Sequence, residues 1–179
     1  MKVRRIIAAT AVAGLGVMAW KILRSGVRPV RRAEPELTKV LIKHAGRIDY
    51  ADAWSTVIYD GEIDDPIEWA HSLLSLKPWV INLLRIRNAL VRPLGLETKP
   101  EGIISYTFFP MLDQDDHEVV LGFDDTHLNF RVGITTRNQR IVMTTTVTIN
   151  NTLGRIYWAV IRWFHPLIVA SGLRNAQIR

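Results

Sequence analysis

The chain has 179 residues, 48% of them hydrophobic and 22% charged, which fits one folded domain with an appendage and excludes a disordered chain. The absence of cysteine excludes disulfides, thiolate nucleophiles and cysteine-bound metal sites. The net charge of +6 divides into +9 over residues 1–47 and −3 over residues 48–179, so the expected domain is mildly acidic and nucleic acid is not an expected partner.

Residues 1–33 are the first expected element, a membrane anchor or signal-like helix with a basic flank. Three basic residues precede an apolar run over residues 6–20, the pattern of a membrane-directed segment. A helix over residues 6–23 would measure about 27 Å, just short of a hydrocarbon core of roughly 30 Å. We therefore expect residues 3–23 to contact a membrane, as a single pass or peripherally; cleavage of the segment as a signal stays open as an alternative.

The basic residues beyond the apolar run indicate its orientation. Five follow the run against three before it, and positive charge resists transfer across a membrane. We therefore expect the domain on the cytoplasmic side. The five residues are Lys21, Arg24, Arg28, Arg31 and Arg32.

A linker that could hold one helical turn is expected over residues 34–47, because this segment has a proline, alternating charges and no long apolar stripe. The domain then occupies residues 48–179. It begins with a strand over residues 51–59, rich in β-branched and aromatic residues, which ends at the turn dipeptide Asp60-Gly61.

Two helices are expected next. Asp65 is placed to cap the first, and Pro66 occupies its first turn, where a missing backbone N–H costs nothing. This helix should run to residue 76, and a second should cover residues 78–92 and end before Pro93.

Four strand-like runs follow and predict an antiparallel meander. Apolar and polar residues alternate most clearly in the third, which indicates one face on the core and one in solvent. The chain closes with a long apolar helix over residues 153–175, expected to be largely buried. This order predicts an α+β helix-grip fold, a curved antiparallel sheet packed on a long C-terminal helix, preceded by the N-terminal membrane helix. The four runs are residues 102–109, 118–123, 127–135 and 140–149.

A family resemblance is carried by three stretches: residues 78–88, residues 122–131 with the sequence Gly-Phe-Asp-Asp-Thr-His-Leu-Asn-Phe-Arg, and residues 151–165. Over residues 48–176 the chain resembles the bacterial domain-of-unknown-function family 2867. The resemblance implies a START-like fold of the SRPBCC type, related to polyketide cyclases, and with the anchor it implies a bacterial inner membrane. Family members often carry Pro-Phe-His where this chain has Trp-Phe-His followed by Pro166, which is expected to shift the kink of the last helix. The family has no assigned catalytic residues, so none is implied.

Arg87 is the most informative charged residue. It falls inside the apolar stripe of the expected helix over residues 78–92, and an unpaired buried guanidinium would cost several kcal/mol. We expect a structural ion pair between Arg87 and Asp124 or Asp125, with binding of a ligand anion as the alternative. Asp124, Asp125 and His127 do not have the spacing of a metal site, so no metal is expected.

His165 directly precedes Pro166, whose ring frees a carbonyl one turn earlier, and the imidazole is expected to satisfy a freed group of this kind. The alternative is a proton donor in a cavity. We assign no catalytic residue and no cofactor, because the chain has no nucleophile elbow and no phosphate-binding glycine loop.

The leading functional hypothesis is a membrane-associated helix-grip domain that binds an apolar small molecule or lipid between its sheet and last helix. An enzyme of cyclase or dehydratase type and a ligand-free interaction module remain the alternatives, and the oligomeric state is open. Aromatic residues of the last helix are expected to pack in the core or line the cavity, with contact to lipid or another subunit as a third option. The expected ligand-binding residues are Phe130, Val132, Met143, Tyr157, Ile161 and His165.

Overall fold

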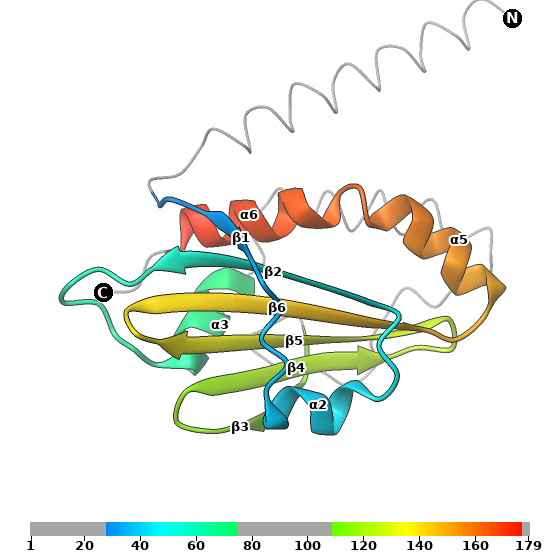
Figure 1. Cartoon of the computed structure of the whole chain (residues 1–179), viewed down its shortest axis with the longest axis horizontal. Helices are drawn as coiled ribbons and strands as arrows, with labels where there is room; N and C mark the ends of the chain where they lie inside the picture. The colour runs from blue at the N-terminus through cyan, green and yellow to red at the C-terminus, as the bar shows by residue number, and fades with distance from the viewer. Residues whose placement is uncertain (1–27, 75–108, 177–179) are drawn as a thin grey trace, which may run out of the picture.

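A computed structural model describes residues 28–74 and 109–176 (Figure 1). These residues form one antiparallel sheet of six strands with helices on both of its faces. The elements in chain order are β1 (Arg31–Ala33), α2 (Lys39–Ala45), β2 (Tyr50–Val57), α3 (Pro66–Leu74), β3 (Met111–Gln114), β4 (Glu118–Asp124), β5 (Leu128–Arg137), β6 (Arg140–Ile149), α5 (Thr152–Ile161) and α6 (His165–Asn175).

The strands lie in the order β1-β2-β6-β5-β4-β3, and every neighbouring pair is antiparallel. Strands β4 to β6 form the expected meander. Asn138 and Gln139 connect β5 to β6 with φ angles of 52° and 55°, as a two-residue type I′ hairpin turn requires. The four strands predicted at residues 51–59, 118–123, 127–135 and 140–149 are confirmed as β2, β4, β5 and β6, with ends that differ by two residues or fewer.

Helices α3 and α6 cover one face of the sheet. Helix α3 packs against β4, β5 and α6, and α6 also contacts β2. The predicted start of α3 is confirmed, because the Asp65 carboxylate accepts a hydrogen bond of 2.8 Å from the backbone N–H of Ile67. Trp69 is fully buried in this core together with Ile134 and Leu173. The expected helix over residues 78–92 and the expected strand over residues 102–109 lie outside the described residues, apart from residue 109.

The other face of the sheet is covered by α2, which corrects two expectations. Residues 34–47 were expected to be a linker, but they contain α2, capped by the Thr38 side chain and packed against β5 through the fully buried Leu41. The second face of β5 was expected in solvent, but Leu41 covers it at Gly133. A Cβ atom added to Gly133 would lie 3.4 Å from a methyl carbon of Leu41. A single buried leucine in a seven-residue helix is too short a pattern to indicate burial from sequence.

Strand β1 was also not expected. Its three residues pair with residues 53–55 of β2 at the edge of the sheet. Arg28, just before β1, is buried and donates hydrogen bonds to the carbonyls of Ala176 at 2.8 Å and Val57 at 2.9 Å, and its guanidinium also pairs with Glu62. The basic flank therefore contributes a buried structural arginine as well as surface charge.

The closing helix is not continuous as predicted. It is divided into α5 and α6, which are bent by 51° at the break. Pro166 explains this division, because proline lacks the N–H of a helical hydrogen bond and its ring collides with the carbonyl of Arg162 four residues earlier. Tight turns complete the break, with the N–H of Phe164 bonded to the Ile161 carbonyl at 2.9 Å.

The expectation that the closing helix is largely buried is correct for α6 only in part and wrong for α5. Helix α5 buries Gly154 and Trp158 and leaves its other side exposed. In the described part of the chain, no helix has by itself the length and apolarity to cross a bilayer, whereas α5 and α6 taken as a bent pair meet that criterion of length and composition. The expected N-terminal membrane helix lies outside the described residues.

Candidate functional site

The candidate site is a buried polar pair between β2 and α6. His165 is the first residue of α6, and its Nε2 lies 3.1 Å from Oδ1 of Asp52 in the middle of β2. Asp52 is only 3% exposed. The break before α6 lets the imidazole reach the sheet, so the same proline that divides the helix also positions this histidine.

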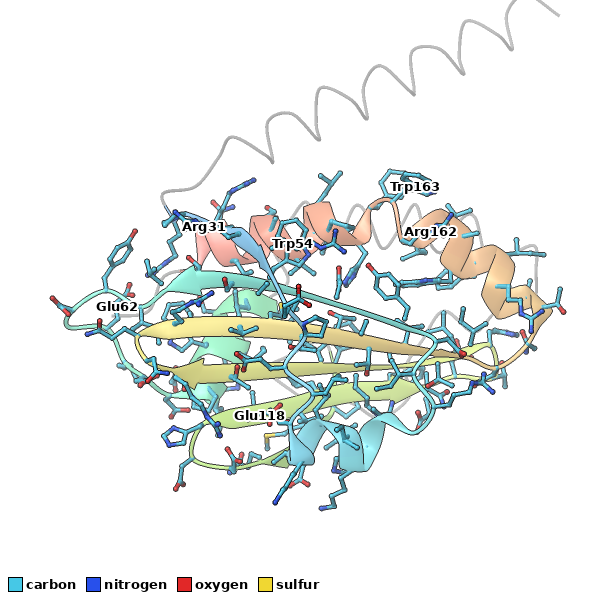
Figure 2. The ribbon with its side chains drawn as sticks, viewed as in Figure 1. Arg31, Trp54, Glu62, Glu118, Arg162 and Trp163 are labelled. Atoms are coloured by element: carbon cyan, nitrogen blue, oxygen red, sulfur yellow. The ribbon has the colours of Figure 1, made fainter. Side chains whose placement is uncertain are left out.

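Two aromatic neighbours on β2 complete the surroundings of Asp52. Trp54 projects from β2 toward α6 (Figure 2), and its Nε1 donates to Oδ2 of Asp52 at 3.3 Å. Burial acts to raise the pKa of Asp52. The hydrogen bond and charge interaction with His165, together with hydrogen bonds from Trp54 and Tyr50, outweigh burial and lower that pKa below its usual value. The site therefore holds an ionised carboxylate at neutral pH.

Tyr50 is perturbed in the opposite direction. Burial, followed by the negative charge of Asp52 and the hydrogen bond to it, raises the pKa of Tyr50 to about 12. The phenol is therefore protonated at neutral pH and serves as a hydrogen-bond donor to Asp52.

Thr145 adds an unsatisfied group to this face. It is the cross-strand partner of Asp52 in the β2–β6 pairing, so both side chains lie on the same face of the sheet. Thr145 is buried, and its Oγ1 makes no hydrogen bond within residues 28–74 and 109–176. A buried hydroxyl without a partner is uncommon, because it forfeits the hydrogen bonds that water would supply.

Apolar side chains flank the pair on both sides. Trp54 packs against a large cluster that includes Trp69 and Leu173. On the other side, the Trp158 ring lies 6.0 Å from the His165 ring and 4.8 Å from the Tyr50 ring, in an edge-on arrangement with Tyr50. The polar atoms are thus enclosed by aromatic and aliphatic surface.

The six residues predicted to bind a ligand lie around this site, on the side of the sheet that carries the C-terminal helices. Val132 and Met143 are buried in the large cluster, and Phe130 belongs to both apolar clusters and packs edge-on against Phe109 at 4.6 Å. Tyr157 and Ile161 pack with Trp158 in the smaller cluster. The residues His165, Phe130, Val132, Met143, Tyr157 and Ile161 are therefore placed in the region between the sheet and the C-terminal helices; their binding role stays a prediction.

The role expected for His165 is corrected. Its imidazole N–H was expected to satisfy a backbone group freed by Pro166, whereas Nε2 of His165 contacts the carboxylate of Asp52. Asp52 and Tyr50 were not predicted as site residues, because this segment was identified as a strand only from its β-branched and aromatic content and from the turn that ends it. The available signal was the position of Asp52 between Tyr50 and Trp54 at spacings of two, because this alternation puts a carboxylate on the same face of the strand as two large aromatic side chains.

Arg87 of the expected ion pair lies outside the described residues. Asp124 accepts a hydrogen bond of 2.6 Å from Nη2 of Arg131, a buried residue that also donates to three backbone carbonyls. Asp125 accepts from the Thr126 hydroxyl at 3.1 Å. The ring of His127 lies within hydrogen-bond distance of Thr126 and Asn151, so these side chains organise the turn that leads into α5.

A depression of about 450 Å³ lies on the α2 side of the sheet, away from the Asp52–His165 pair. None of the six predicted ligand-binding residues lines it. Within the described ranges, no three His, Asp or Glu side chains converge in a way that could hold a metal ion. The depression is lined by Glu36, Leu37, Thr38, Thr135, Arg137, Asn138, Arg140 and Val142.

The fold and site together define an α+β domain with a six-stranded antiparallel sheet, C-terminal helices on one face and a buried Asp–His pair beneath them. The family described as "Protein of unknown function (DUF2867)" matches residues 44–172, and the chain belongs to this family. The resemblance noted in the sequence is thereby confirmed at the level of the family. No curated protein and no solved structure matches the chain.

Proposed function

We propose that this protein is a membrane-associated domain that binds an apolar small molecule or lipid between β2–β6 and the α5–α6 helices. The observation that carries the proposal is the Asp52–His165 pair, enclosed between two apolar clusters. Replacing a buried polar pair by apolar residues is often neutral or stabilising, so stability alone does not account for such a pair. Perturbed ionisable groups in apolar surroundings are characteristic of functional sites.

The polar atoms favour a particular ligand chemistry. Asp52 carries a negative charge, which would repel a carboxylate or phosphate, whereas a hydroxyl group could donate to it. The Thr145 hydroxyl, which has no hydrogen-bond partner among the described residues, can both donate and accept. A neutral apolar molecule with one hydroxyl group, such as a terpenoid alcohol, therefore fits these groups better than a fatty acid.

The membrane part of the proposal rests on the sequence. The apolar run with basic flanks over residues 3–23 supports attachment to a bacterial inner membrane, and the preponderance of basic residues after the run supports a cytoplasmic domain. The curved antiparallel sheet with C-terminal helices supports a START-like helix-grip arrangement, in which ligands would enter between sheet and helix. Ligand capture by a tethered domain would then take place at the membrane surface.

An acid–base enzyme is the second candidate, and one observation favours it. When Nε2 of His165 donates to Asp52, Nδ1 is the free basic nitrogen, and the carboxylate fixes this tautomer. Such a pair can take a proton from the carbon next to the hydroxyl-bearing carbon and deliver it to the leaving hydroxyl, so that a double bond forms and water is released, as dehydratase chemistry requires.

Native mass spectrometry of the gently extracted full chain tests the proposal. We expect an adduct of a neutral apolar molecule, and competition with added farnesol as the probe. Asp52→Asn should weaken farnesol binding about tenfold, because it removes a charged hydrogen-bond acceptor, whereas the matched control Asp124→Asn, on the α2 side, should not. A chain that carries no adduct and binds neither farnesol nor a fatty acid would contradict the proposal and leave the ligand-free interaction module.

The same incubation separates binding from catalysis. A binding protein returns farnesol with its mass unchanged. Loss of water from the probe, abolished by His165→Gln in a variant that still binds it, would favour the enzyme.

A further inference from the structure

An exposed apolar surface lies at the break between α5 and α6. Four large apolar side chains there, here called the α5–α6 surface, are between 40% and 70% exposed, and Trp163 is the most exposed of them. Their spacing of four, three and one residues keeps them on one side of α5 and its C-terminal end. The four are Ile156, Val160, Trp163 and Phe164.

The charged side chains of α5 and of the break that follows it are basic. Arg155 and Arg162 are exposed on α5 and at its end, and the Arg162 guanidinium lies 5.4 Å from the centre of the Trp163 ring. Residues 152–179 contain no Asp or Glu. Figure 2 shows Arg162 and Trp163 on the outer side of the helices, away from the sheet. Tryptophan and arginine side by side suit the boundary between headgroups and acyl chains of a bilayer.

The chain enters the domain on this same side. Arg28 is anchored to the carbonyl of Ala176 at the end of α6, and Arg31 lies on the same upper side of the molecule as Trp163 (Figure 2). Arg28 follows Leu23, the end of the expected membrane segment, by five positions, so the two are at most about 18 Å apart. A membrane segment would therefore hold this side of the domain close to the bilayer.

We propose that the α5–α6 surface docks on the interface of an anionic lipid bilayer, with its apolar side chains among the upper acyl chains and Arg155 and Arg162 at the headgroups. The proposal rests on the membrane association proposed above and adds a second contact, made by the folded domain. A second copy of the chain is a poorer partner, because a twofold contact through this surface would bring together helices whose charged residues are all basic.

The absence of cysteine allows a direct test in the full chain. Trp163→Cys is labelled with an environment-sensitive dye in vesicles of phosphatidylcholine and phosphatidylglycerol. Met111→Cys serves as the matched control, since Met111 is 53% exposed on the edge strand β3, at the opposite end of the strand order from β1. We expect the dye at position 163 to shift to the blue and to be shielded from aqueous iodide, and the dye at position 111 to remain in water.

Charge removal makes the test quantitative. Arg155→Gln and Arg162→Gln should each lower the ratio of shielded to unshielded dye at position 163 roughly fivefold, as expected for one arginine at an anionic surface. Replacing phosphatidylglycerol by phosphatidylcholine should lower this ratio further, because the vesicle surface then carries no net negative charge. Thermal unfolding of each labelled protein establishes that it is folded.

Three outcomes would overturn the inference, and they separate it from the proposed function. If the protein sediments with vesicles while both dyes stay in water, membrane association stands and the docking surface is wrong. If both dyes are shielded equally, contact is not specific to α5–α6. If the protein does not associate with vesicles at all, both the docking surface and the membrane association fail.

Discussion

Glu118 is a buried carboxyl group whose surroundings oppose its ionisation. It lies on β4 beside α2 (Figure 2), its Oε2 accepts a hydrogen bond from Thr38, and its Oε1 has no partner among the described residues. Burial, only partly offset by the Thr38 hydrogen bond, raises the pKa of Glu118 above its usual value. The folded state therefore holds the proton more tightly than the unfolded state.

This pKa shift has a defined consequence for stability. Between the unfolded and folded pKa values, the folded state binds the extra proton, so the free energy of unfolding falls as pH rises through that window. We expect Glu118→Gln to be more stable than the unsubstituted chain at pH 7, and to lose this part of its pH dependence above pH 4.5. Urea unfolding from pH 4 to pH 8 measures both effects; identical pH profiles would contradict the assignment.

Asp52 has the opposite linkage. Its pKa is lowered in the folded state, so its stabilising contribution is present above the unfolded value near 3.8 and is lost as pH falls through the folded value. Asp52→Asn should cost about 1–3 kcal/mol at pH 7, because it weakens a buried hydrogen-bonded pair, and should flatten the acid limb of the stability curve. Urea unfolding between pH 2 and pH 7 checks this; an unchanged acid limb would show that Asp52 does not titrate in this window.

Helix α2 packs on the sheet through Leu41, the larger of its two buried residues. Leu41 is fully buried against β5 at Gly133, whereas its neighbour Ile42 is 51% exposed on the same helix. Leu41→Ala should cost about 2–5 kcal/mol through loss of burial and creation of a cavity. Ile42→Ala is the matched control and should change the free energy of unfolding by less than about 0.5 kcal/mol. Equal losses for the two variants would mean that α2 is not packed as described.

Helix α5 begins at a cap that joins it to the β4–β5 turn. The side chain of Asn151 accepts a hydrogen bond of 2.9 Å from the N–H of Gly154, and its amide also donates to the carbonyl of Thr126. A Cβ at position 154 would lie 2.0 Å from the carbonyl oxygen of His127, so only glycine permits this close approach. The Asn-Thr-Leu-Gly sequence that carries part of the family resemblance thus has a structural role in positioning α5.

Attachment to the membrane concerns the molecule as a whole. The full chain should sediment with membranes and resist extraction by 0.5 M salt, because an apolar segment is not released by screening of charge. In a chain that begins at Arg28, the α5–α6 surface is the only proposed membrane contact that remains. Its binding to anionic vesicles should therefore be weak and should be abolished by 0.5 M salt. Recovery of the full chain in the soluble fraction would contradict the proposed membrane association.

The parts of the fold that were predictable are those encoded in neighbouring residues. Alternation and turn residues identified β2, β4, β5 and β6, and the Asp-Pro pair identified the start of α3, because strand periodicity and helix capping act over a few residues. The division of the closing helix also has a local cause in Pro166, whereas two features were beyond that reach: the short edge strand β1 and the burial of α2. Each depends on what lies opposite it in space.

By itself, the sequence determined the α+β class, four strands of the sheet and the family to which the chain belongs. Only the tertiary structure decided that His165 faces Asp52, 113 residues away in the chain, and that one side of α5 is left uncovered. The physical reason is that local patterns specify how a segment folds, whereas sheet register and helix packing decide which distant side chains meet. The candidate site is a product of that packing and is therefore not readable from any one segment.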